Sequence, residues 1–290
     1  GIIAIDQSTN KVDGVTGVTA ATTEGDARGI YALDSENTVN GNGAAVSATA
    51  TTGEADGIVA KTTGTKAAVN TVTGITDVTA SGSTDAYGIG ASGKGATYTA
   101  KNDVTMTGSI DATSTEKGTV AGVGAFTYGT NIVTGAVNVT ASGVEGDAYG
   151  VGASANSSNE VEMTGALSAT TTSGNASGII AVDQSTNTVD GVTGVTAATT
   201  EGDARGIYAL DSENTVNGNG AAVSATATTG EADGIVAKTT GTKAAVNTVT
   251  GITDVTASGS TDAYGIGASG KGATYTAKND VTMTGSVNAT

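Results

Sequence analysis

The chain consists of one short segment repeated along its whole length, and this repetition constrains the fold more than any other feature. Cutting before each Gly-(Ile/Val)-x-Ala unit gives segments that begin at residues 1, 29, 57, 88, 122, 150, 178, 206, 234 and 265. Residues 178–290 then repeat residues 1–113 with four changes, so a larger unit of 177 residues restarts there, its second copy incomplete. Such self-similarity is typical of solenoid architectures. We therefore expect residues 1–290 to form a single continuous solenoid, a fragment of a longer repeat protein.

The composition favours a thin, regular core. The chain has 45 Gly, eight Tyr and one Phe, and it has no Trp, Pro, Cys or His. A large globular core needs bulky side chains that interdigitate, and few are present. Disordered chains are usually poor in β-branched residues and rich in Pro, whereas Val and Thr are abundant here and Pro is absent. The composition therefore favours stacked coils over a globule or a disordered chain.

Each segment divides into three short extended pieces separated by Gly- or Asn-rich corners. In the first piece, Ile30 and Ala32 stand in columns that are apolar in every segment, and the position between them is free. This alternation has period two, which is typical of a strand with one buried face. Apolar spacing of the helical kind is absent over any helical length. We predict an all-β, parallel β-solenoid (β-helix) with three short strands per coil of 28–34 residues, right-handed, with essentially no helix.

The other two pieces and the segment end supply further columns. The second piece is expected to be centred on Val12, Val39, Val72, Met106, Val133 and Met163. The third is expected to point Val18, Val46, Val78, Ala112, Val139 and Ala169 inward, and Thr19, Ser47, Thr79, Thr113, Thr140 and Thr170 outward. Segments close on an inward residue such as Ala27, which requires a kink at Gly29 because Ala27 and Ile30 both face the core. The length variation falls before the second piece, in a corner, where a stacked coil tolerates insertions.

Catalytic chemistry has few side chains to use. Without His or Cys, a nucleophile has no imidazole base, and zinc and haem have no usual ligand. Paired carboxylates are the remaining option, for a polysaccharide-active β-helix enzyme. The acids, however, are expected to stay apart at corners: Asp26, Asp34, Glu36, Glu54, Asp56, Asp85 and Asp147. We assign no catalytic, cofactor-binding or metal-binding residue and expect no enzyme.

Calcium is an alternative that the oxygen-rich stretches 34–37 and 6–10 leave open, since Ca²⁺ prefers carboxylate and amide oxygens. The G-G-x-G-x-D repeat of calcium-binding β-rolls is absent, and Asn and Asp also form ordinary turns. The outward Thr column suggests ice binding, but the positions two residues before it are neither flat nor uniform. The column is more simply explained by strand propensity.

Surface residues and charge bear on partners. Tyr31, Tyr87, Tyr149, Tyr208 and Tyr264 fall at free positions that we expect to be exposed. They serve either as contacts for glycans or for a neighbouring rod, or as cover for the solvent face of a sheet. The net charge of −16 and the presence of only two Arg exclude nucleic acid as a partner. No run of 18 apolar residues exists, so this segment is not expected to span a membrane.

Tandem Gly-(Ile/Val)-x-Ala and Val-x-(Val/Ala)-Thr-Ala units, acidic and free of Cys, resemble the repetitive β-helical passenger regions of bacterial autotransporters and large surface adhesins. Residues 147–153 also resemble trimeric autotransporter head repeats, although those have coils about half as long. The first resemblance implies export and display on the bacterial cell surface, hence an extracellular location. We expect a structural repeat region of a surface fibre or stalk, with copies of the same protein as lateral or end-to-end partners. The alternative is an adhesin that binds host or matrix glycans.

Overall fold

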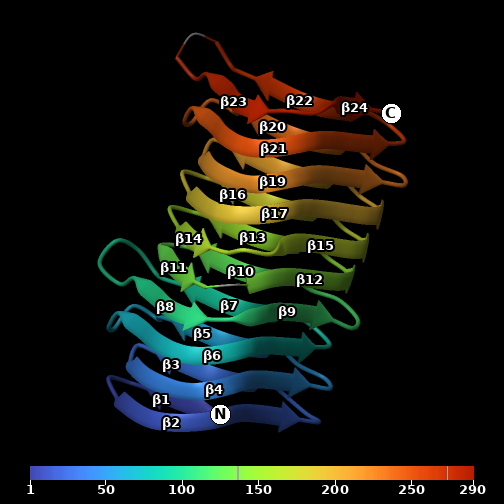
Figure 1. The fold of residues 1–290 in the computed structure, drawn as a ribbon. Coiled ribbons are helices and arrows are strands. Elements are labelled where there is room, and N and C mark those ends of the chain that lie inside the picture. The colour runs from blue at the N-terminus through green and yellow to red at the C-terminus, as the bar shows by residue number, and fades with distance from the viewer. Residues whose placement is uncertain (136, 273) are drawn as a thin grey trace.

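The chain folds into one straight stack of coils with the two termini at opposite ends (Figure 1). The computed structural model describes residues 1–135, 137–272 and 274–290. Over these residues it contains strands and no helix, in two parallel sheets that line opposite sides of the stack. The predicted all-β solenoid is confirmed. No helix in this part of the chain is long and apolar enough to cross a membrane.

The first sheet, sheet A, takes one short strand from each coil. Its strands in the described residues are β1 (Ile2–Ile5), β3 (Ala27–Leu33), β5 (Ala55–Lys61), β7 (Ala86–Ser92), β10 (Val120–Phe126), β13 (Ala148–Ser154), β16 (Ala176–Val182), β18 (Ala204–Leu210), β20 (Ala232–Lys238) and β22 (Ala263–Ser269). Ile2 pairs with Ile30, and Ile30 with Ile58, so equivalent residues of successive coils lie in register. The stack therefore rises by one strand spacing, about 4.8 Å, per coil.

The second sheet, sheet B, is wider because it holds the second and third pieces of each coil. Its strands are β2 (Thr9–Thr22), β4 (Glu36–Ala50), β6 (Ala68–Gly82), β8 (Ala100–Met106), β9 (Gly108–Ser114), β11 (Gly129–Thr134), β12 (Val137–Glu145), β14 (Ser158–Glu162), β15 (Ala166–Ser173), β17 (Thr186–Glu201), β19 (Glu213–Ala227), β21 (Ala245–Gly259), β23 (Ala277–Met283) and β24 (Val287–Ala289).

The second and third pieces are separate strands in only some coils. In β2, β4, β6, β17, β19 and β21 they run together as one strand of 14–16 residues with a bulge in the middle. Gly14 adopts a positive φ of 72° at this bulge, so the corner is a bend within a strand. The prediction of three short strands per coil is therefore correct only in the coils where the second and third pieces are separate strands, as with β8 and β9.

Two of the predicted columns are out of register by two residues. Val104, and not Met106, pairs with Val72 and Val133, and Val161 takes the place predicted for Met163. Likewise Ile110 and Leu167 occupy the positions predicted for Ala112 and Ala169. A shift of two residues leaves a side chain on the same face of a strand, so all of these residues are still buried. As a consequence, Asp111 and Ser168 interrupt the outward Thr column.

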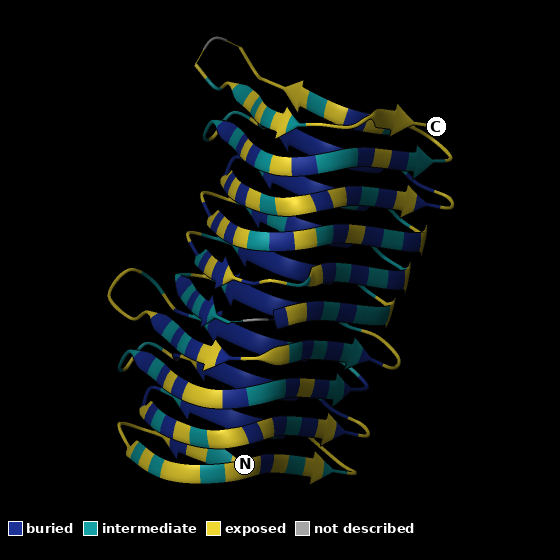
Figure 2. Cartoon of the chain, viewed as in Figure 1, coloured by how far each residue is buried: buried dark blue, intermediate teal, exposed yellow. Residues whose placement is uncertain are grey.

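The core is a thin apolar layer between the two sheets (Figure 2). The columns that contain Ile30, Val39 and Val46 are fully buried in the interior coils. Ala27 is buried too, as predicted, although it lies only three residues before Ile30. Between them, a Cβ on Gly29 would lie 2.6 Å from the Val46 side chain and 2.5 Å from the Gly57 carbonyl oxygen. The constant Gly is therefore a packing requirement.

A buried ladder of asparagines, which we did not predict, runs through the coils beside this core. It contains Asn10, Asn37, Asn70, Asn102, Asn131, Asn159, Asn187, Asn214, Asn247 and Asn279. From Asn10 to Asn247, each side-chain amide donates to the Oδ1 of the next Asn at 2.9–3.0 Å. Asn131 also donates to the Gly124 carbonyl oxygen at 2.8 Å, which ties the corner to sheet A. The ladder satisfies buried polar groups that the corner would otherwise leave unpaired.

Candidate functional site

The outward face of sheet A differs from coil to coil, and the clearest candidate site lies on it. Each strand presents three outward positions there, which in β5 hold Asp56, Val59 and Lys61. The register places Tyr87, Gly90 and Ser92 of β7 directly beside them. The middle position is large in some coils, as with Tyr31 and Val59, and glycine in three successive coils. These three glycines are Gly90, Gly124 and Gly152.

The tyrosines of this face are less exposed than predicted. Tyr31 and Tyr208 are only 5% and 7% exposed, so for these two the prediction is wrong. The cause is an overlying arginine: the Arg28 guanidinium carbon lies 4.7 Å from the centre of the Tyr31 ring, and Arg205 covers Tyr208 in the same way. Tyr87 and Tyr149 are half-buried, and only Tyr264, in the last coil, is widely exposed.

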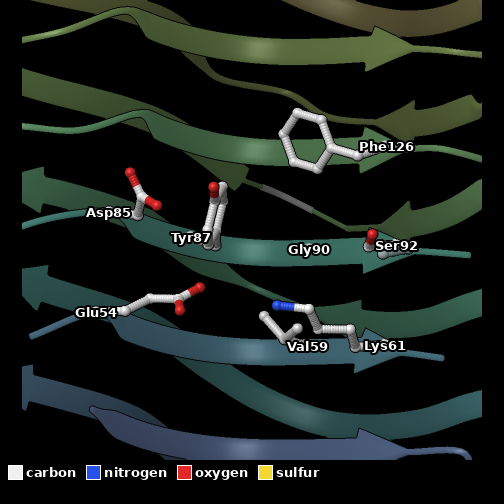
Figure 3. A pocket seen from close by; sticks show the side chains of 9 residues that line it. Glu54, Val59, Lys61, Asp85, Tyr87, Gly90, Ser92 and Phe126 are labelled. Carbon is white, nitrogen blue, oxygen red and sulfur yellow. The ribbon is translucent and has the colours of Figure 1, made fainter. Parts of the chain in front are cut away.

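The three glycines leave a shallow depression that side chains surround, and its lower part is a hollow of about 220 Å³, which we call the Tyr87 hollow (Figure 3). Gly90 forms its floor, Glu54, Asp85 and Tyr87 stand on one side, Val59 and Lys61 lie below, and Ser92 and Phe126 close the other side. The rings of Tyr87 and Phe126 meet edge to face, with centroids 5.6 Å apart.

Carboxylates dominate the electrostatics of the Tyr87 hollow. Asp56 neighbours Tyr87 on the adjacent strand and is only 2% exposed. Burial, reinforced by the nearby Glu54 carboxylate, raises the pKa of Asp56 to about 8 against the opposing effect of Arg28 and Lys61. Burial raises the pKa of Tyr87 as well, with Asp85 and Glu54 adding to the effect. Asp56 therefore keeps its proton to a higher pH than an ordinary aspartate does.

The expectation that the acids stay apart is wrong for Glu54, Asp56 and Asp85, which gather around Tyr87. The register of β5 and β7 brings them together, since residues 54 and 85 both lie just before their strands. Other acids stay separate: Asp26 binds Arg28 at 2.7 Å, and Asp147 accepts a hydrogen bond from the Tyr149 hydroxyl at 2.8 Å. Glu36 forms an exposed ion pair with Lys66.

Asp34, considered for calcium, is engaged by its own chain. It turns the corner with a φ of 48°, is 1% exposed, and accepts hydrogen bonds from Thr62, Thr63 and the Lys66 amide. Burial alone would raise the pKa of Asp34, but these bonds outweigh it and hold the pKa well below its usual range. In the other stretch, Asp6 and Gln7 also form a left-handed turn. Across the described residues, no three acids are grouped in a way that suits a metal ion.

A second version of the Tyr87 hollow lies in the next 177-residue unit. Glu231, Val236, Lys238, Tyr264 and Gly267 line a hollow of about 330 Å³, in the same order as their equivalents in the first. Here the lysine behaves differently. The Lys238 ammonium lies 2.7 Å from Glu231 Oε1 and 3.5 Å from Asp233 Oδ2. Among the described residues, the equivalent Lys61 makes no ion pair and is exposed.

The sequence analysis did not identify two sets of residues: the glycines at the middle outward position of sheet A and the asparagines of the ladder. Three successive glycines at a free, outward position are readable from the sequence once the strands are aligned, and they mark the floor of the depression. Comparison with known proteins adds nothing to this: no protein-family model, curated protein or solved structure matches the chain.

Proposed function

We propose that the chain is a structural repeat region of a long extracellular bacterial surface fibre or stalk, to which it gives length and rigidity. The observation that supports this most is the continuity of the interior. The Asn ladder passes from coil to coil without a break between Asn10 and Asn279, and the apolar columns stack in the same way. Such a stack extends by adding units, and each coil contacts only its neighbours.

Adding material to a rod is the direct test. A chain with one more 177-residue unit should be longer by about 29 Å, six strand spacings, with an unchanged cross-section. Small-angle scattering separates the two quantities. A particle that grows thicker at constant length would contradict the rod, because it would show that the units pair side by side. Surface display is tested separately, by protease digestion of this region on intact cells of the source bacterium.

A second candidate function is adhesion, through glycans or sister filaments that contact the outward face of sheet A. The Tyr87 hollow favours it, because aromatic rings and hydrogen-bonding groups meet there on a face that the core does not constrain. A glycan array and sedimentation of the purified chain distinguish the two kinds of partner. Concentration-dependent sedimentation without glycan binding would favour filaments, and the reverse result would favour glycans. Catalysis on a polysaccharide is the least favoured reading.

A further inference from the structure

The two versions of the hollow show what kind of group this arrangement accepts. In the second unit Lys238 lines the hollow, and its ammonium group is bonded to Glu231 and near Asp233. It also lies 5.8 Å and 5.7 Å from the ring centres of Tyr208 and Tyr264. Two carboxyl groups and two aromatic faces are the features that bind an ammonium group in proteins. The chain thus supplies its own cationic ligand at this place.

In the first unit the same residues are present without that ligand. Residues 54–61 are identical in sequence to residues 231–238, yet Lys61 makes no ion pair among the described residues. Asp56 is 98% buried, and its Oδ1 has no hydrogen-bond partner among the described residues, as is also true of Asp233 Oδ1 in the second unit. The cation nearest to Asp56 is Arg28, whose Nε lies 3.4 Å from the other carboxylate oxygen. Among the described residues, the Glu54 carboxylate therefore has no ion-pair partner, whereas the equivalent Glu231 holds an ammonium group.

Phe126 gives the Tyr87 hollow an apolar side in addition to its carboxylates. Its ring projects over the Gly124 position and closes the hollow opposite Glu54 (Figure 3). At about 220 Å³ the hollow is smaller than a pocket for a drug-sized molecule, so it accommodates about one small ring. A fitting ligand carries an ammonium group at one end and an apolar face at the other. Anionic ligands are disfavoured by Glu54 and Asp85 and by the net charge of −16.

We propose that the Tyr87 hollow binds an amino sugar, with its ammonium group on Glu54 in the place that Lys238 takes in the second unit and its ring against Phe126. The glycan is accordingly a polymer of 2-amino-2-deoxyhexose with free amines. This inference rests on the adhesin role and is independent of the fibre role. Lys61 is an internal competitor, because it reaches the same carboxylates when it adopts the Lys238 conformation.

Calorimetry with a β-1,4-linked glucosamine tetramer tests the site, in mildly acidic buffer where the sugar amine is charged. Glu54→Gln, which keeps the shape and a hydrogen-bonding group, should weaken binding about tenfold or more, since a charged hydrogen bond is lost. Lys61→Met keeps an unbranched side chain but removes the competing ammonium group, and it should strengthen binding several-fold. Glu160→Gln changes the net charge equally at an exposed position of β14 on sheet B, and should leave the affinity unchanged. Circular dichroism confirms that each variant is folded.

Two further ligands separate the possible failures. The N-acetylated tetramer has the same rings without the ammonium group and should bind at least tenfold more weakly; equal binding would overturn the ammonium assignment while the adhesin role stands. Spermine has the amines without the rings, and if it matches the sugar, the site is a general cation site and the proposal is wrong. Absence of binding by the glucosamine tetramer to both the parent chain and Lys61→Met would also overturn it, and the glycan array then decides the adhesin role on its own.

Discussion

Replacing one asparagine in the middle of the ladder should destabilise the rod far more than its small size suggests. Asn131 is fully buried and makes three side-chain hydrogen bonds. It accepts from Asn102 at 2.9 Å, and it donates to Asn159 at 2.9 Å and to the Gly124 carbonyl oxygen at 2.8 Å. Asn131→Ala removes all three bonds and leaves buried partners of three residues with one bond fewer.

The magnitude follows from those bonds. A typical hydrogen bond contributes about 1 kcal/mol net, and a buried group left without its partner costs about 1–3 kcal/mol. Because the three partners keep some of their other bonds, we expect Asn131→Ala to lower the free energy of unfolding by about 3–6 kcal/mol. Asn10→Ala should cost less, since Asn10 is only half-buried and lies at the end of the ladder.

Urea unfolding followed by circular dichroism measures the loss, and hydrogen exchange locates it. Exchange should accelerate first in the coils on either side of Asn131, because each coil is stabilised mainly by its neighbours. Asn42→Ala is the matched control: Asn42 is exposed, and no side-chain hydrogen bond of it occurs within the described residues. If Asn131→Ala and Asn42→Ala agree within about 0.5 kcal/mol, the size of an ordinary surface effect, the ladder does not hold the coils together.

Three other predictions concern single positions. The pKa of Asp56 is raised to about 8, so the folded chain holds a proton that the unfolded chain loses near pH 4. The stability that this group contributes is therefore lost as the pH rises toward 8, by up to about 1.4 kcal/mol per pH unit. Asp56→Asn should flatten this dependence of the free energy of unfolding on pH in urea titrations. Gly122→Ala should cost about 1–3 kcal/mol in thermal melts, since its Cβ would lie 2.2 Å from the side chain packed beneath it, whereas Gly17→Ala, with 3.9 Å of room, should be nearly neutral. Asp34→Ala should release the loop at residues 62–67 to proteases without unfolding the stack, and resistance equal to that of the parent would refute its anchoring role.

The fold class and the core columns of the first strand were predictable because they depend on a strict two-residue alternation. The register errors have the same origin. Met106 is followed by a Gly two residues later, as Val72 is, so the two appear equivalent, and a shift of two residues keeps both buried. Burial patterns alone therefore cannot distinguish Val104 from Met106 as the partner of Val72.

The Asn ladder carried the information that would have resolved this. Every coil contains Asn-x-Val, as in Asn70-Thr71-Val72 and Asn102-Asp103-Val104, and aligning on that motif gives the observed register. A polar residue in a constant column indicates stacking of side-chain amides, which only a parallel in-register arrangement allows. The burial of Tyr31 could not be predicted for another reason. It depends on the Arg28 side chain that lies over the Tyr31 ring, and the periodicity of the sequence does not encode this contact.

The outward face of sheet A is the place where the fibre role and the adhesin role meet. The two 177-residue units differ at only four of the positions they share, so the recurrence of the hollow follows from their near-identity and is not in itself evidence of a function. The variation within one unit is more informative. Packing of the core does not constrain the middle outward position of the sheet A strands. This position holds Tyr31 and Val59 in two successive coils and Gly90 and Gly124 in the next two. A rigid stack repeats this difference at intervals of about 29 Å, so under the adhesin proposal a polymeric glycan that displaces the competing lysine would engage weak sites along one rod together. Length would then increase avidity as well as reach.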